Sequence, residues 1–186
     1  MANFLGSGYE SMSETGDGSG LAAYVRGNLD ATLTWDDLDW LASITSLPVI
    51  PKGILHPDDA RLAVEHGARA IGVSNHGGRQ LDSAIASLDA LPAVAEEVDG
   101  RVEILFDGGV RRGTDVIKAL ALGARAVLIG RPYIWGLAVG GEQGAYQVME
   151  ILRTELRLDL ALCGCSSVGA IDRGLLAPAG RAETLD

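Results

Sequence analysis

The chain has 186 residues, of which 47% are hydrophobic and 22% are charged, and its formal net charge is −10. This length and composition indicate one globular domain and exclude a large multidomain enzyme. The acidic balance disfavours nucleic acid as a partner, and no apolar run approaches the roughly 20 residues of a membrane span. With no signal segment at the N-terminus, the cytoplasm is the expected location.

The chain begins with a segment, residues 1–33, whose glycine, serine and acidic residues predict a loop or tail. Thr34 and the acidic residues after it are typical of a helix start, so we expect a helix to about Ile44. After this helix, short apolar runs alternate with segments of helical period. The expected strands are 47–52, 70–74, 102–106 and 126–130, and the expected helices are 56–66, 87–98, 114–122 and 142–156.

The βα units repeat in sequence. Residues 59–71 align without gaps with residues 115–127, and in each copy a glycine is expected to end the helix. Repeated parallel units favour the (β/α)₈ barrel of the TIM-barrel family over a Rossmann sheet, because no glycine fingerprint follows the first strand. A complete barrel needs at least about 200 residues. We therefore expect half a barrel, its last four βα units, over residues 34–178, and a tail over 179–186.

The residues with the most distinctive chemistry follow the predicted strands. Lys52 follows the first strand, and Ser74 opens a nine-residue polar segment after the second. Asp107 follows the third strand and Gly130 follows the fourth. In a parallel barrel, the C-terminal ends of the strands form the face on which function resides. The four segments should therefore converge on one rim.

The segments after the third and fourth strands are typical of a phosphate site. Gly108 and Gly109 let the backbone approach an anion closely, and a helix is expected to begin just beyond them. Arg111 and Arg131 add planar donors that suit phosphate. Taken singly, each segment is also compatible with a tight turn and solvated arginines. Together they favour phosphate.

His76 is the candidate general base, because it lies on a glycine-flanked loop that leaves space for a ligand. Arg79, three residues on, could hold a carboxylate with two hydrogen bonds. Lys52 has three interpretations: a Schiff-base lysine, a partner for an anionic cofactor atom, or half of an ion pair. Tyr133 and Trp135 are expected to pack rather than to serve as stacking platforms. No metal site is expected.

Four motifs closely resemble the FMN-dependent α-hydroxy acid dehydrogenase/oxidase family. They are Pro51-Lys-Gly-Ile54, Ser74-Asn-His-Gly-Gly-Arg-Gln-Leu-Asp82, Asp107-Gly-Gly-Val-Arg-Arg-Gly113 and Ile129-Gly-Arg-Pro132. Within the family, residues 33–38 and 52–61 are most similar to the lactate 2-monooxygenases. The resemblance implies FMN as cofactor and a small, lactate-like 2-hydroxy acid as substrate.

The resemblance also implies roles for individual residues. His76 would remove a proton from the hydroxy acid and Arg79 would hold its carboxylate. Lys52 would lie against the N1/O2 edge of the flavin, and Asp107 would contact the ribityl chain. The implied FMN-binding set is Lys52, Ser74, Asp107, Gly108, Gly109, Val110, Arg111, Gly130 and Arg131.

The family carries four further strands before the segment matched here, so this chain alone is expected to bind FMN weakly. A second copy, or a separate N-terminal half, would close the barrel. Two alternatives remain open. One is a different phosphate-binding barrel, such as a nucleotide dehydrogenase or an FMN-dependent isomerase, which the pairing of His76 with Arg79 disfavours. The other is a non-catalytic truncated protein that keeps only an anion site.

Overall fold

The computed structural model describes residues 30–177, which fall into two compact units divided after Asp37. The predicted N-terminal loop or tail lies outside the described residues except for 30–33, and the predicted tail 179–186 lies outside them entirely. Helix α2 (Trp35–Ile44) begins where the sequence predicted. The Asp37 carboxylate accepts hydrogen bonds from the backbone N–H of Thr34 at 2.6 Å and from its hydroxyl at 3.1 Å. These bonds stabilise the first turn of α2.

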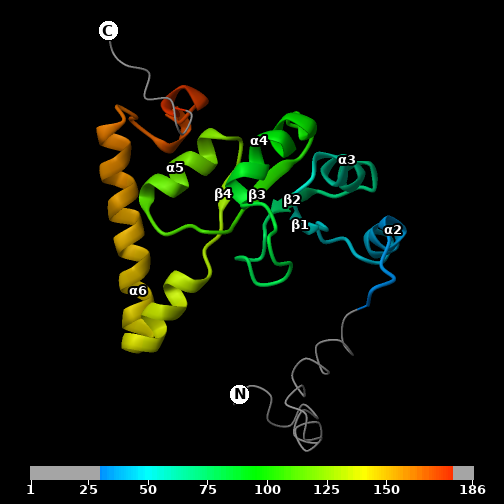
Figure 1. Cartoon of the computed structure of the whole chain (residues 1–186), viewed down its shortest axis with the longest axis horizontal. Helices are drawn as coiled ribbons and strands as arrows, with labels where there is room; N and C mark the ends of the chain where they lie inside the picture. The colour runs from blue at the N-terminus through cyan, green and yellow to red at the C-terminus, as the bar shows by residue number, and fades with distance from the viewer. Residues whose placement is uncertain (1–29, 178–186) are drawn as a thin grey trace, which may run out of the picture. The chain divides into compact units, whose positions relative to one another are not determined.

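The centre of the second unit is a four-stranded parallel sheet in the order β1-β2-β3-β4 (Figure 1). Its strands are β1 (Lys52–Ile54), β2 (Ala70–Val73), β3 (Glu103–Phe106) and β4 (Ala126–Val127). Val73 pairs with Phe106, which pairs with Val127. The carboxyl ends of the strands therefore lie at one edge of the sheet, and the segments that follow them are brought together there.

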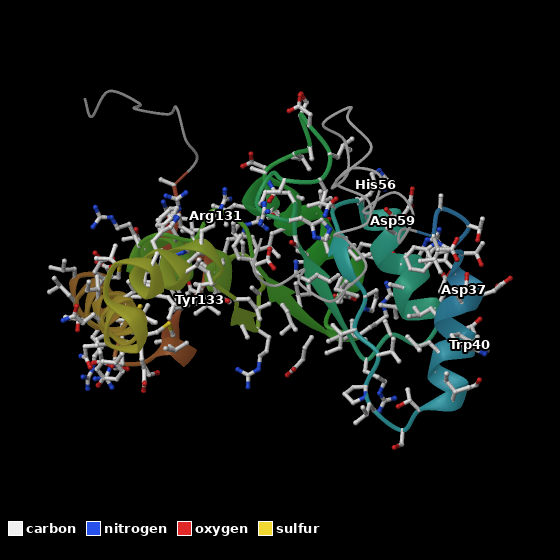
Figure 2. The ribbon with its side chains drawn as sticks, turned by 90° about the horizontal axis from the view of Figure 1, so that it is seen from below. Asp37, Trp40, His56, Asp59, Arg131 and Tyr133 are labelled. Atoms are coloured by element: carbon white, nitrogen blue, oxygen red, sulfur yellow. The ribbon has the colours of Figure 1, made fainter. Side chains whose placement is uncertain are left out.

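The connecting helices are those that the sequence predicted. They are α3 (Pro57–Glu65), α4 (Ser87–Val98) and α5 (Gly113–Ala121). Gly67 and Gly123 follow α3 and α5 with φ of +81° and +109°, a region that favours glycine, so both predicted helix ends are confirmed. His56 caps α3 by accepting a hydrogen bond from the Asp58 N–H at 3.2 Å, and Figure 2 shows it at the start of that helix.

The core of this unit lies between α4 and the two central strands. Its largest fully buried side chains are Phe106, Ile71, Leu91, Val73, Val94 and Val98. All four residues of β2 are buried, as expected for a parallel strand that is covered on both faces. Burying an aliphatic or aromatic side chain of this kind contributes about 1.5–3 kcal/mol, so this layer holds the rim segments in place.

Two predicted strand boundaries are wrong. The first strand was expected over 47–52, yet β1 begins at Lys52, so Lys52 opens the strand instead of following it. Pro48 and Pro51 explain the shift: they lack the N–H that a regular ladder needs, although the Val49 and Pro51 carbonyls still accept bonds from the neighbouring segment. The fourth strand, expected over 126–130, ends at Val127.

The final helix is longer than predicted and is interrupted. Helix α6 (Arg131–Leu162) contains the expected helix 142–156, but a non-helical break at Gly140 and Gly141 separates it from an earlier helical stretch. A side chain on Gly136 would collide with the Gly144 backbone, and the converse also holds, so the two stretches are in close backbone contact. Two short 3₁₀ helices follow, η3 (Val168–Ala170) and η4 (Arg173–Leu175). Within residues 30–177, no helix has the length and apolar character needed to cross a membrane.

Candidate functional site

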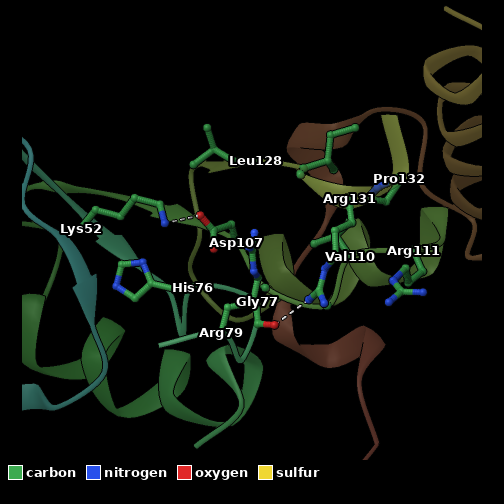
Figure 3. A pocket seen from close by; sticks show the side chains of 14 residues that line it. Lys52, His76, Gly77, Arg79, Asp107, Val110, Arg111, Leu128, Arg131 and Pro132 are labelled. Atoms are coloured by element: carbon green, nitrogen blue, oxygen red, sulfur yellow. Dashed lines mark hydrogen bonds and ion pairs between the residues drawn. The ribbon is translucent and has the colours of Figure 1, made fainter. Parts of the chain in front are cut away.

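The rim segments enclose one pocket of about 270 Å³, shown in Figure 3. It lies at the carboxyl ends of the strands, the edge at which the sequence placed the candidate site. Its lining includes every residue that the sequence singled out except Ser74, namely Lys52, His76, Arg79, Asp107, Gly108, Gly109, Val110, Arg111, Gly130 and Arg131. The structure therefore brings four separate stretches of sequence to one cavity.

Ser74 lies just beneath this lining and links two of the residues that face it. Its hydroxyl is fully buried and donates to Asp107 Oδ1 at 2.5 Å. It also accepts from Lys52 Nζ at 2.9 Å, while Lys52 Nζ lies 2.8 Å from Asp107 Oδ2. The three side chains form a closed polar network at the start of β1 and just after the ends of β2 and β3. Of the three interpretations of Lys52, the structure shows the ion pair.

Lys52 reaches the rim from the start of β1 because its neighbour in the sheet is a glycine. Lys52 pairs with Gly72 of β2, and a Cβ on Gly72 would lie 3.0 Å from Lys52 Cγ. The missing side chain leaves room for the aliphatic stem of the lysine. The Lys52 side chain remains 45% exposed, whereas the Asp107 side chain is only 18% exposed, so the lysine can still meet a ligand in the pocket.

His76 is held in an unusual backbone conformation. Its φ is +55°, which is costly for a residue with a side chain and is characteristic of functional sites. The His76 N–H donates to Ser74 Oγ at 3.0 Å, so the Lys52–Ser74–Asp107 network also orients the loop that carries His76. On its other side the imidazole lies against Gly53, where an added Cβ would sit 2.6 Å from His76 Nε2. The ring is thus fitted against β1.

The glycine turn after β3 has one packed residue and one open residue. Gly108, with φ +113°, has no room for a side chain because a Cβ there would meet Ser87 Oγ at 2.5 Å. Gly109, with φ +78°, has no neighbouring atom within 4 Å of such a Cβ and lines the pocket. The backbone at Gly109 is therefore open to a ligand, as a phosphate cradle requires.

Helix α5 follows the glycine turn and is anchored on α6 through Glu155. This carboxylate accepts from the Gly113 N–H at 3.1 Å and from Arg112 Nη1 at 2.9 Å. The Gly113 N–H and then the Arg112 guanidinium lower the pKa of Glu155 from its ordinary value of 4.5. Together these contacts attach the start of α5, and with it the glycine turn, to α6.

The arginines of the pocket are held in different ways. Arg111 stacks its guanidinium over the Trp135 ring, 4.6 Å from the centroid. Trp135 was expected to pack rather than to serve as a stacking platform, and in the structure the side chain against its ring is that of a pocket arginine. Arg131 Nη2 donates to the Gly77 carbonyl oxygen at 2.6 Å. Arg79 lines the same cavity from the loop after β2.

Three contributors were not singled out from the sequence, namely Gly53, Gly72 and Glu155, and Trp135 was considered there without its arginine partner. For the first two, the signal was a glycine within or beside a strand, which often marks a close approach of another group. Trp135 and Glu155 act through contacts between distant elements, which sequence spacing does not reveal.

The chemistry of the cavity suits an anionic ligand beside a proton acceptor. Lys52, Arg79, Arg111 and Arg131 line it, and Asp107 is the acidic residue among its lining residues. A planar guanidinium matches both carboxylate and phosphate oxygens. His76 adds a group able to take up a proton near neutral pH. The arrangement can hold a phosphate at one end and a carboxylate substrate near the histidine.

Comparison with known proteins assigns these features to one family. The model of the FMN-dependent dehydrogenase family matches residues 4–178. The chain is 57% identical to human 2-hydroxyacid oxidase 1 over 161 residues, which are 87% of this chain and 44% of the human protein. It is 60% identical to L-lactate oxidase from Nostoc sp. over 158 residues, 85% of this chain and 43% of that enzyme. The chain thus spans less than half the length of these relatives.

Solved structures show the same relation in three dimensions. A mandelate oxidase crystallised with benzoyl-formic acid is 50% identical and matches with a TM-score of 0.73. The match covers 76% of this chain and 42% of that one. The four parallel βα units are therefore half of a (β/α)₈ barrel, which confirms the predicted fold class.

Proposed function

The chain belongs to the FMN-dependent dehydrogenase family, and from this we propose that it takes part in the FMN-dependent oxidation of a small L-2-hydroxy acid. The observation that carries the proposal is the single cavity in which His76 and Arg79 face the same space as Gly109, Arg111 and Arg131. One part of this set suits a carboxylate next to a base. The other part suits a phosphate.

The residues present fit FMN. Gly109 leaves an open backbone position, and Arg111 and Arg131 would hold the phosphate beside it. Lys52 would place a positive charge near the flavin ring, with Ser74 and Asp107 fixing the direction of its ammonium group. When bound, FMN supplies the acceptor for the two electrons that leave the substrate.

The chain's own side chains supply orientation and proton transfer. Arg79 would bind the substrate carboxylate through its planar donors and so hold the α-carbon near the imidazole. His76 would take a proton from the hydroxy acid, and the ring lies against Gly53, which limits its movement. The left-handed backbone of His76 keeps the ring in the cavity at some cost in stability.

The substrate is proposed to be lactate-like, in keeping with the resemblance of residues 33–38 and 52–61 to lactate 2-monooxygenases. The named relatives include a 2-hydroxyacid oxidase and an L-lactate oxidase. A panel of glycolate, L-lactate and L-mandelate, offered to the FMN-loaded chain without oxygen, would rank the substrates by the rate at which flavin absorbance is lost.

His76→Ala is the direct test of the proposal. Loss of a general base should slow flavin reduction by about 10²–10⁴-fold, while FMN affinity, measured by flavin fluorescence, stays near that of the wild type. His56→Ala is the matched control, because His56 caps α3 and does not line the pocket. Failure of the wild-type chain to bind FMN even weakly would overturn the proposal, as would a His76→Ala variant that reduces flavin at the wild-type rate.

A further inference from the structure

Arg131 connects the two ends of the pocket. It is the first residue of α6, which follows β4 after residues 128–130, and its guanidinium reaches a loop 54 residues earlier in the chain. Nη2 donates a hydrogen bond to the Gly77 carbonyl oxygen at 2.6 Å, which Figure 3 shows as a dashed line. Gly77 is the residue next to His76. One arginine therefore lies on the anion side of the cavity and contacts the loop of the candidate base.

The loop that carries His76 is conformationally demanding. His76, Gly77 and Gly78 follow one another with φ of +55°, +69° and +69°. Three consecutive residues in the left-handed region are unusual, and the first of them has a side chain that disfavours it. Such a loop keeps its conformation only where surrounding contacts hold it.

The other hydrogen bonds that hold these three residues come from the start of the same loop. The His76 N–H donates to Ser74 Oγ at 3.0 Å, and the Gly77 N–H donates to Asn75 Oδ1 at 3.0 Å. The Gly78 N–H donates to the Asn75 carbonyl at 2.9 Å. All of these fix N–H groups. Arg131 differs because it holds a carbonyl and comes from across the pocket.

We propose that Arg131 is a positioning residue that couples anion binding in the pocket to the conformation of the His76 loop. The inference rests on the proposed function, which puts a phosphate beside Arg131. A guanidinium has five N–H donors, so the bond to Gly77 leaves others for a phosphate. A bound phosphate restricts the guanidinium, which then holds the Gly77 carbonyl more firmly. By linkage, an ordered loop also strengthens anion binding.

The chain offers a matched pair of variants that isolates this contact. Gly77→Ala puts a Cβ 2.7 Å from Arg131 Nη2, so the guanidinium must move away from the loop. Gly78→Ala introduces a Cβ at the same φ of +69°, where no neighbouring atom lies within 4 Å. Both variants carry the same kind of backbone strain, and they differ in whether the arginine is displaced.

The experiment is backbone NMR with hydrogen exchange on the full 186-residue chain, with inorganic phosphate and FMN as separate probes. The Gly109 amide reports the anion site, and the His76 amide reports the loop. In the wild type and in Gly78→Ala, each probe should shift the Gly109 resonance and slow exchange at His76 about fivefold or more, the lower end of typical couplings between sites. In Gly77→Ala, Gly109 should still respond while His76 does not.

The outcomes separate the coupling from the proposed function. If Gly109 responds in the wild type but His76 does not, or if Gly77→Ala behaves like Gly78→Ala, the coupling is overturned and the anion site stands. If phosphate shifts Gly109 and FMN does not, the proposed FMN function fails, while the response of His76 to phosphate still decides the coupling. If neither probe shifts Gly109, both are overturned.

Discussion

Ser74→Ala should destabilise this chain more than the loss of one buried hydroxyl ordinarily does. The Ser74 hydroxyl is fully buried and makes three hydrogen bonds, to the Asp107 carboxylate, the Lys52 ammonium and the His76 N–H. Alanine removes all three and leaves the partners in place. Two of the three partners are charged, and hydrogen bonds to charged groups contribute more than neutral ones.

The magnitude follows from those partners. A hydrogen bond to a charged group contributes about 1.5–3 kcal/mol and a neutral one about 1 kcal/mol, so simple addition gives about 4–7 kcal/mol. That sum is an upper bound, because Lys52 and Asp107 still pair at 2.8 Å and the lysine remains open to water. We therefore expect the free energy of unfolding to fall by about 2–3 kcal/mol. For a chain of this length, that lowers Tm by about 4–12 °C.

Urea and thermal denaturation followed by circular dichroism would measure the loss. Ser87→Ala is the control, because Ser87 is also buried and its hydroxyl accepts a hydrogen bond from the neutral Asn75 N–H at 2.8 Å. It should lose about 1 kcal/mol. A Ser74→Ala variant no less stable than Ser87→Ala would refute the idea that the Lys52–Ser74–Asp107 network stabilises the rim.

Three further predictions concern separate contacts. Gly53→Ala puts a carbon 2.6 Å from His76 Nε2, so a ring shift of about 1 Å should slow flavin reduction about 10²-fold, whereas Gly67→Ala, with open space around it, should keep the rate. Trp135→Ala should weaken FMN binding about two- to fivefold and leave riboflavin binding unchanged, and equal losses for both flavins would contradict the stacking argument. Because the pKa of Glu155 is lowered, its contribution to stability is complete above pH 4.5 and is lost as the pH falls through the lowered pKa. Glu155→Gln should therefore lose less stability than the wild type over that acid range, and identical acid melting profiles would count against the contact.

The sequence predicted the architecture well because the signals were local and repeated. The segments 59–71 and 115–127 carry the same helix end and strand start, and the structure has α3 with β2 and α5 with β4 at those places. Helix α4 (Ser87–Val98) matches its predicted range at both ends. Strand ends were less predictable, because proline at 48 and 51 changes which backbone groups can join the ladder.

The topology of the sheet made it possible to predict which residues line the pocket. The contacts between their side chains could not be predicted in this way. Residues that follow parallel strands must meet at one edge, so the position of His76 and Arg131 near one another follows from strand order alone. The His76 ring contacts Gly53, and Arg111 contacts Trp135. Both contacts depend on how residues from different βα units pack against one another. No spacing rule in a single sequence reports such contacts.

The chain has a net charge of −10, whereas the pocket lining is positively charged. This difference in sign affects which ligands the pocket can bind. The acidic residues are dispersed over the chain, whereas the pocket lining combines one lysine and three arginines with Asp107, and Asp107 is already paired with the lysine. The net positive charge of the lining is therefore equal to that of its three arginines. Arg111 stacks on the Trp135 ring, a contact that does not use its N–H donors. Arg131 uses one of its donors to bind the Gly77 carbonyl in the loop that carries His76. In the proposed function, the FMN phosphate and the carboxylate of a separate substrate would together satisfy both ends of this cavity, whereas either anion alone would leave one end uncompensated.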